Sequence, residues 1–158
     1  MLNLNKLFFL LLLFSVSTVH AELMPPTVGT CGFYLQLEQE KQCGDLGYLK
    51  NYGFPYCQKF TFQEKNRFTN QGQRFVVKAG LCLQNVLWKN HLSLDDEACS
   101  EIKTKAFESH THCYYHSGFC KLTFHDKMVV FSIVKGELLQ SIHRKQALKM
   151  LKICRMSR

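Results

Sequence analysis

Eight cysteines constrain this 158-residue chain more than any other feature of its sequence. All of them lie beyond residues 1–21, which have the form of a secretory signal peptide: Lys6 precedes an apolar run over 7–16, and Ala21 offers a small residue for cleavage. An even number of cysteines in an exported chain predicts disulfides, and the count alone leaves their pairing open. The cysteines are Cys31, Cys43, Cys57, Cys82, Cys99, Cys113, Cys120 and Cys154.

The chain after the signal peptide, residues 22–158, is expected to form a single domain. Its length is that of one domain, and 46% of the sequence is apolar, so burial of apolar surface can offset the loss of chain entropy. No later segment is apolar over the roughly 20 residues that a membrane-spanning helix needs. The expected location is secreted and extracellular, or periplasmic if a bacterial producer retains the chain.

Hydrophobic spacing predicts helices along most of the chain. One helix is expected to begin at Pro55 and reach Phe68, followed by a break at Gln71 and Gly72. A second apolar stripe then begins at Phe75 and runs over 75–87. The sequence therefore predicts two helices joined by a short turn.

The second half of the chain has three further segments. Ser93 and Asp96 have the spacing of a capping box, which predicts a helix that ends near Gly118. The segment 128–134 is ambiguous, since its β-branched residues suit a strand and its length suits a buried helix. A last helix is expected from the apolar stripe over 139–154. The pattern as a whole predicts an all-α fold.

Positive charge is concentrated at the C-terminal end. Residues 22–120 contain ten Lys or Arg and ten Asp or Glu, whereas residues 121–158 contain nine Lys or Arg against only Asp126 and Glu137. Such asymmetry is consistent with an anionic partner, a glycan or a lipid, or with a solvated helix face. Nucleic acid is not expected, because no aromatic residues alternate with the basic ones. The candidate patch comprises Arg144, Lys145, Lys149 and Lys152.

The sequence contains few patterns typical of catalysis or of metal binding. His112 and His116 are four residues apart and would share a helix face, a spacing that can bind zinc or copper but that is equally compatible with a structural role. There is no C-x-x-C, no H-E-x-x-H, no G-x-S-x-G and no phosphate-binding glycine loop. We therefore expect no enzymatic activity and no cofactor.

The order of residues in the middle of the chain resembles the core of the stanniocalcins. The resemblance is carried by segments 56–60 (YCQKF), 68–76 (FTNQGQRFV) and 82–85 (CLQN), and by the later cysteines at similar spacings. It implies a disulfide-braced helical bundle. It also implies a pairing, which is Cys31 with Cys57, Cys43 with Cys99, Cys82 with Cys113, and Cys120 with Cys154.

Stanniocalcins are secreted helical hormones linked to calcium and phosphate balance, and some inhibit a secreted metalloprotease. The resemblance implies a binding protein with hormone-like activity towards an extracellular protein or receptor. The chain lacks the family's first intrachain cysteine pair, its dimer-linking cysteine, its long C-terminal extension and any Asn-x-Ser/Thr glycosylation site. A homodimer would therefore be non-covalent. The alternative is a membrane-active protein whose basic C-terminal helix binds anionic lipid.

Overall fold

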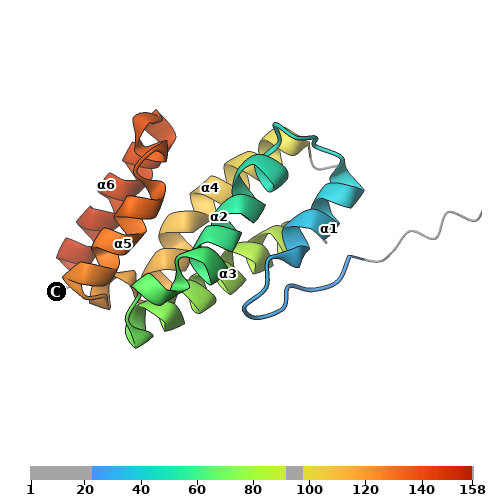
Figure 1. The fold of residues 1–158 in the computed structure, drawn as a ribbon. Helices are drawn as coiled ribbons and strands as arrows, with labels where there is room; N and C mark the ends of the chain where they lie inside the picture. The colour runs from blue at the N-terminus through green and yellow to red at the C-terminus, as the bar shows by residue number, and fades with distance from the viewer. Residues whose placement is uncertain (1–22, 92–97, 158) are drawn as a thin grey trace, which may run out of the picture.

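The computed structural model describes residues 23–91 and 98–157, and within them the chain is helical, with no strand (Figure 1). The expected all-α, disulfide-braced fold class is therefore confirmed. The expected signal peptide lies outside the described residues. The α-helices are α1 (Gly32–Lys41), α2 (Phe54–Gln58), α3 (Asn70–His91), α4 (Cys99–His116), α5 (Phe124–Val134) and α6 (Ser141–Met156). Shorter π or 3₁₀ turns are η1 (Leu49–Gly53), η2 (Lys59–Gln63), η3 (Lys65–Arg67), η4 (Phe119–Lys121) and η5 (Glu137–Leu139).

Four disulfides connect the helices, and they are the same four pairs that the resemblance implies. Cys82–Cys113 joins α3 to α4, and Cys120–Cys154 joins the turn after α4 to the end of α6. The other two pairs, Cys31–Cys57 and Cys43–Cys99, attach the N-terminal segments. Each disulfide is expected to contribute on the order of 2–4 kcal/mol, mainly by restricting the unfolded chain.

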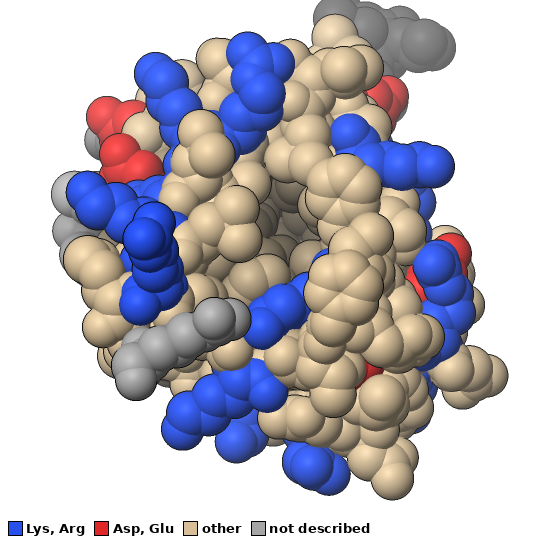
Figure 2. All heavy atoms as spheres, turned by 90° about the vertical axis from the view of Figure 1, so that its left-hand side faces the viewer, with Lys and Arg blue, Asp and Glu red and all other residues tan. Residues whose placement is uncertain are grey.

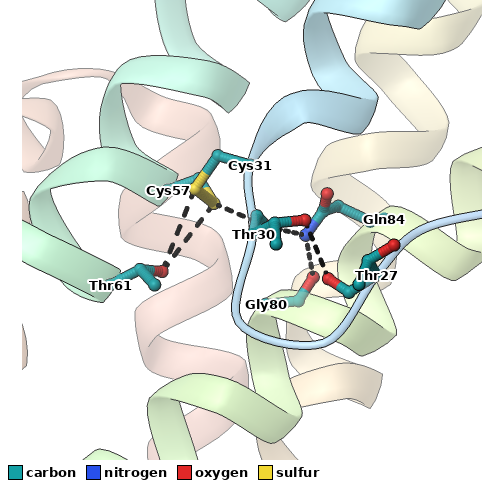
Figure 3. The surroundings of a disulfide bond; sticks show 7 residues. All are labelled: Thr27, Thr30, Cys31, Cys57, Thr61, Gly80 and Gln84. Atoms are coloured by element: carbon teal, nitrogen blue, oxygen red, sulfur yellow. Dashed lines mark hydrogen bonds between the residues drawn. A yellow bond between two sulfur atoms is a disulfide. The ribbon is translucent and has the colours of Figure 1, made fainter.

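The segment before α1 is held against α3 beside the Cys31–Cys57 disulfide (Figure 3). Gln84 is buried on α3, and its Nε2 donates hydrogen bonds to the carbonyl oxygens of Thr30 at 2.9 Å and Gly80 at 3.2 Å. A buried amide of this kind supplies the hydrogen bonds that water would otherwise make. The contact therefore fixes the position of Cys31 opposite Cys57.

A row of tyrosines connects the N-terminal core to the centre of the bundle. Tyr48, Tyr52 and Tyr56 follow one another at four-residue spacing, with ring centroids 5.6 Å and then 4.4 Å apart. Tyr48 and Tyr52 both pack edge-on against Phe107 of α4. Tyr52 also stacks on His143 of α6, with centroids 5.3 Å apart. This row therefore reaches the part of the molecule where α4 and α6 meet.

A second core joins α5 to α3. It contains Phe75, Val76 and Ala79 from α3 and Val129 and Val130 from α5. The segment 128–134, ambiguous between strand and helix in the sequence, lies within α5 and is helical.

Asp126 fixes the start of α5 to the start of α3. Its fully buried carboxylate accepts hydrogen bonds from Thr69 N (2.9 Å), Thr69 Oγ1 (2.7 Å) and Thr123 Oγ1 (3.0 Å). Burial acts most strongly and raises the pKa of Asp126, but the hydrogen bonds outweigh it, so the pKa is lowered overall. Gly72 permits this approach, because a Cβ at that position would lie 2.5 Å from Asp126 Oδ1.

The expected helix break at Gln71 and Gly72 is wrong. The chain is extended at Phe68, where ψ is 145°, and α3 begins at Asn70 and continues through Gly72. Glycine is needed here for the close approach of Asp126 and not for a turn.

Two other expected helix boundaries also differ. The helix expected from Pro55 to Phe68 is α2 followed by η2 and η3, and it ends before Phe68. The last helix begins at Ser141, so Leu139 lies outside it and is exposed. The expected capping box at 93–96 lies outside the described residues.

We predict that Asp126→Asn lowers the free energy of unfolding by about 2 kcal/mol at neutral pH, because an amide cannot accept all three hydrogen bonds. Since the pKa of Asp126 is lowered in the folded state, its contribution is present above the unfolded pKa and is lost as pH falls through the folded value. The difference between variant and parent should therefore shrink below about pH 4. Urea unfolding at several pH values measures it.

Asp45→Asn is the matched control, because Asp45 is exposed and pairs with Lys50 at the surface. It should change stability little. Equal losses in the two variants would contradict the role assigned to Asp126.

Candidate functional site

The candidate site is a groove between α5 and α6. Helix α5 packs on α3 through Val129 and Val130. Helix α6 packs on α4, where Gln146 Nε2 donates to Phe107 O and the ring centroids of His143 and Phe107 lie 4.8 Å apart. Because the two helices dock on different partners, they leave a trough with α4 at its floor.

Both ends of the groove are fixed. At one end the Cys120–Cys154 disulfide ties α6 to the turn after α4. At the other end Glu137 of η5 accepts hydrogen bonds from Tyr56 Oη at 2.7 Å and from Gln140 Nε2 at 3.0 Å. The separation of α5 and α6 is therefore held at both ends of the groove.

The groove has a volume of about 520 Å³, which is within the usual range for small-molecule sites. Figure 2 shows the hollow on the side of the molecule formed by α5 and α6, with Lys and Arg side chains around its mouth. Its apolar lining consists of Phe119, Val130, Phe131, Val134, Leu138, Ala147, Met150 and Leu151. The interior therefore suits an apolar ligand.

The polar groups in the floor are uncharged near neutral pH. Burial lowers the pKa of His110 to about 4, although His110 Nδ1 donates a hydrogen bond to Ala106 O at 2.7 Å. Burial also lowers the pKa of His143, an effect that the Glu137 carboxylate partly opposes. It raises the pKa of Tyr114 to about 12. The floor thus presents neutral side chains in a site of low polarity.

Two cations line the groove at the disulfide end. Lys127 of α5 donates from Nζ to Cys120 O at 3.1 Å, and Arg155 follows Cys154 on α6. At the opposite end lie His143 and Leu138. His143 and Cys154 are eleven residues apart on α6, so the groove is roughly 16 Å long at 1.5 Å per helical residue. The groove is therefore apolar along its length and positive at one end.

The expected basic patch lies on α6, with all four residues exposed. Lys145, Lys149 and Lys152 form no ion pair among the described residues. Arg144 instead donates to the carbonyl oxygens of Leu138 and Leu139, which stabilises η5. The sequence did not distinguish Lys127 and Arg155 from their basic neighbours, since only the three-dimensional arrangement brings them to the groove.

The structure brings His112 and His116 together on the exposed face of α4, with ring centroids 4.3 Å apart. Within residues 23–91 and 98–157 no group of three His, Cys, Asp or Glu side chains is arranged to hold a metal ion. A metal role for this pair stays a prediction.

The chain matches no protein-family model, no curated protein and no solved structure. In the part of the chain that the structure describes, no helix has the length and apolar character needed to span a bilayer. Four disulfides are typical of proteins that fold in an oxidising compartment, which is consistent with export.

We predict that acidification from pH 7 to pH 5 destabilises the fold. The unfolded chain takes up a proton at His110 near pH 6.5, whereas the folded chain does so near pH 4, so stability falls as pH falls between these values. The loss from His110 alone should be about 2 kcal/mol. The measurement is urea unfolding at several pH values.

His110→Phe should flatten this pH dependence, because the replacement cannot be protonated. His112→Phe, at an exposed position on the same helix, is the control and should leave the change of unfolding free energy with pH as it is in the parent. If His110→Phe also left it unchanged, His110 would not be the source of the pH dependence.

Proposed function

We propose that this protein is an exported binding protein that holds an anionic single-chain amphiphile, of the long-chain fatty-acid type, in the groove between α4, α5 and α6. The observation that carries the proposal is an apolar groove of about 520 Å³ whose lining contains cations only at the disulfide end. An aliphatic chain would occupy the apolar length, and its carboxylate would lie beside Lys127 and Arg155.

The dimensions of the groove support a single extended chain. Its length of roughly 16 Å is close to half of the ~30 Å hydrocarbon core of a bilayer, which is the depth that one acyl chain spans. The neutral floor supports an orientation with the carboxylate at the cationic end. A carboxylate buried among His110, Tyr114 and Tyr52 would lose its hydration without gaining a positive partner, which costs free energy. The expectation that the chain is no enzyme stays a prediction and fits a binding role.

We predict that palmitate displaces an environment-sensitive fluorescent fatty acid from the purified protein without its signal peptide. Ala147→Trp should abolish this binding, since the indole would fill the groove. The matched control is Leu46→Trp, at a position that is 91% exposed and remote from the groove lining. Fluorescence titration measures the affinity.

The contribution of charge is tested with the double variant Lys127→Gln/Arg155→Gln. It should weaken palmitate binding about tenfold, consistent with two partly exposed ion pairs, and should abolish the preference for palmitate over hexadecanol. Lys65→Gln is the control, because Lys65 is exposed on η3 and does not line the groove. Equal dye binding by the parent and Ala147→Trp would disprove the groove as the site.

A second candidate function is the hormone-like role that the resemblance to stanniocalcins implies. Its specific support is the disulfide pairing, because all four bonds join the cysteines that the resemblance pairs. We propose on this basis a stanniocalcin-like secreted factor that acts on an extracellular receptor in calcium or phosphate balance, or inhibits a secreted protease. Calcium and phosphate uptake by epithelial cells, measured with native and with reduced and alkylated protein, tests the hormone role. Identical uptake with both samples would count against it.

A further inference from the structure

Helix α5 has an apolar face that no other part of the described structure covers. Val129 and Val130 face α3, whereas Phe124, Met128 and Phe131 recur at spacings of four and three residues and are exposed. Phe124 is 79% exposed, an unusual position for a side chain of this size. Helix α5 therefore has two apolar faces, one of which packs in the core.

Helix α6 has a similar face across the groove. Leu148 and Leu151 are 66% and 63% exposed and lie three residues apart, on the same side of the helix. Phe131 on α5 and Leu151 on α6 also line the groove. Exposed apolar side chains therefore border the mouth of the groove on both sides, and contiguous patches of this kind mark interaction sites.

The same face carries positive charge that no described carboxylate neutralises. Lys135, Lys149 and Lys152 are exposed and form no ion pair among the described residues. The two carboxylates of the segment after residue 120 point inward: Asp126 is buried against Thr69 and Thr123, and Glu137 accepts from Tyr56 and Gln140. Figure 2 shows Lys and Arg side chains on several sides of the hollow, with fewer Asp and Glu towards the edges of this face.

We infer that this rim, formed by Phe124, Met128, Leu148 and Leu151 with Lys149 and Lys152, docks on the surface of a membrane that contains anionic lipid. Apolar side chains beside lysines along one helix face are the pattern of helices that lie in a membrane interface. The lysines would contact lipid headgroups, and the apolar side chains would enter the boundary between headgroups and acyl chains. A second copy of this chain fits less well, since two such faces would bring like charges together.

This inference rests on the proposed function, because docking of the rim would bring the open side of the groove to the lipids that supply its ligand. The two are nevertheless separable. Ala147→Trp fills the groove but leaves the rim intact, so it should still bind vesicles. A protein that binds vesicles but no fatty acid would contradict only the proposed ligand of the groove. A protein that binds fatty acid but no vesicles would contradict only the docking of the rim.

The experiment is sedimentation of the protein, without its signal peptide, with vesicles of phosphatidylcholine alone or with phosphatidylglycerol. We expect binding to the anionic vesicles at low salt, at least about tenfold weaker binding at high salt, and little binding to phosphatidylcholine alone. Phe124→Ser/Met128→Ser should reduce binding to the anionic vesicles about tenfold. Neither residue lines the groove, so fatty-acid displacement should be unchanged. Leu46→Ser is the matched control for loss of an exposed apolar side chain.

Charge is tested with Lys149→Glu/Lys152→Glu against Lys65→Glu/Lys78→Glu, which changes the net charge equally at exposed positions away from the rim. Only the first pair should lose vesicle binding. Equal losses would show attraction by the overall charge and overturn the assignment of the rim. No sedimentation with anionic vesicles would overturn the inference, as would a concentration-dependent dimer abolished by Phe124→Ser/Met128→Ser.

Discussion

The Cys82–Cys113 disulfide between α3 and α4 is the constraint on which the rest of the structure depends. It fixes the two longest helices side by side (Figure 1), and helices α1, α5 and α6 each pack against one or both of them. The N-terminal segment attaches to α3 through Gln84, and the tyrosine row attaches to α4 through Phe107. A small domain gains from such a bond because its apolar core alone supplies limited stability.

The groove follows from how the last two helices attach to that pair. The hydrogen bonds of Asp126 and the second core hold α5 against α3. Helix α6 is held against α4 by the contacts of Gln146 and His143 with Phe107. Neither helix can close the gap without breaking its own contacts, and the Cys120–Cys154 disulfide prevents α6 from moving away. The cavity is thus a product of the packing arrangement and needs no internal charge or strain to stay open.

The sequence predicted the helical class from apolar spacing, and the resemblance implied the disulfide pairs that the structure contains. The sequence could not predict the groove. The groove exists because α5 packs on α3 and α6 packs on α4, and these choices depend on contacts between residues far apart in the chain. Gly72 shows the same limit: it was interpreted as a helix break, while its role depends on Asp126, 54 positions later. Lys127 and Arg155 likewise differ from other basic residues only by position.

The distribution of charge in the C-terminal segment indicates that the basic residues do more than keep this face solvated. A face selected for solubility alone would be expected to mix both signs and to avoid large exposed apolar side chains. Here Asp126 and Glu137 are used for internal hydrogen bonds, and the lysines of α6 form no ion pair with any residue that the structure describes. Exposed phenylalanine and leucine side chains lie on the same two helices. Charge and apolar surface are thus presented together, next to a groove with the same two properties. The groove and the rim would therefore suit the same class of molecule, an amphiphile with a negative head. A single molecule would fit the groove, and a bilayer of such molecules would fit the rim.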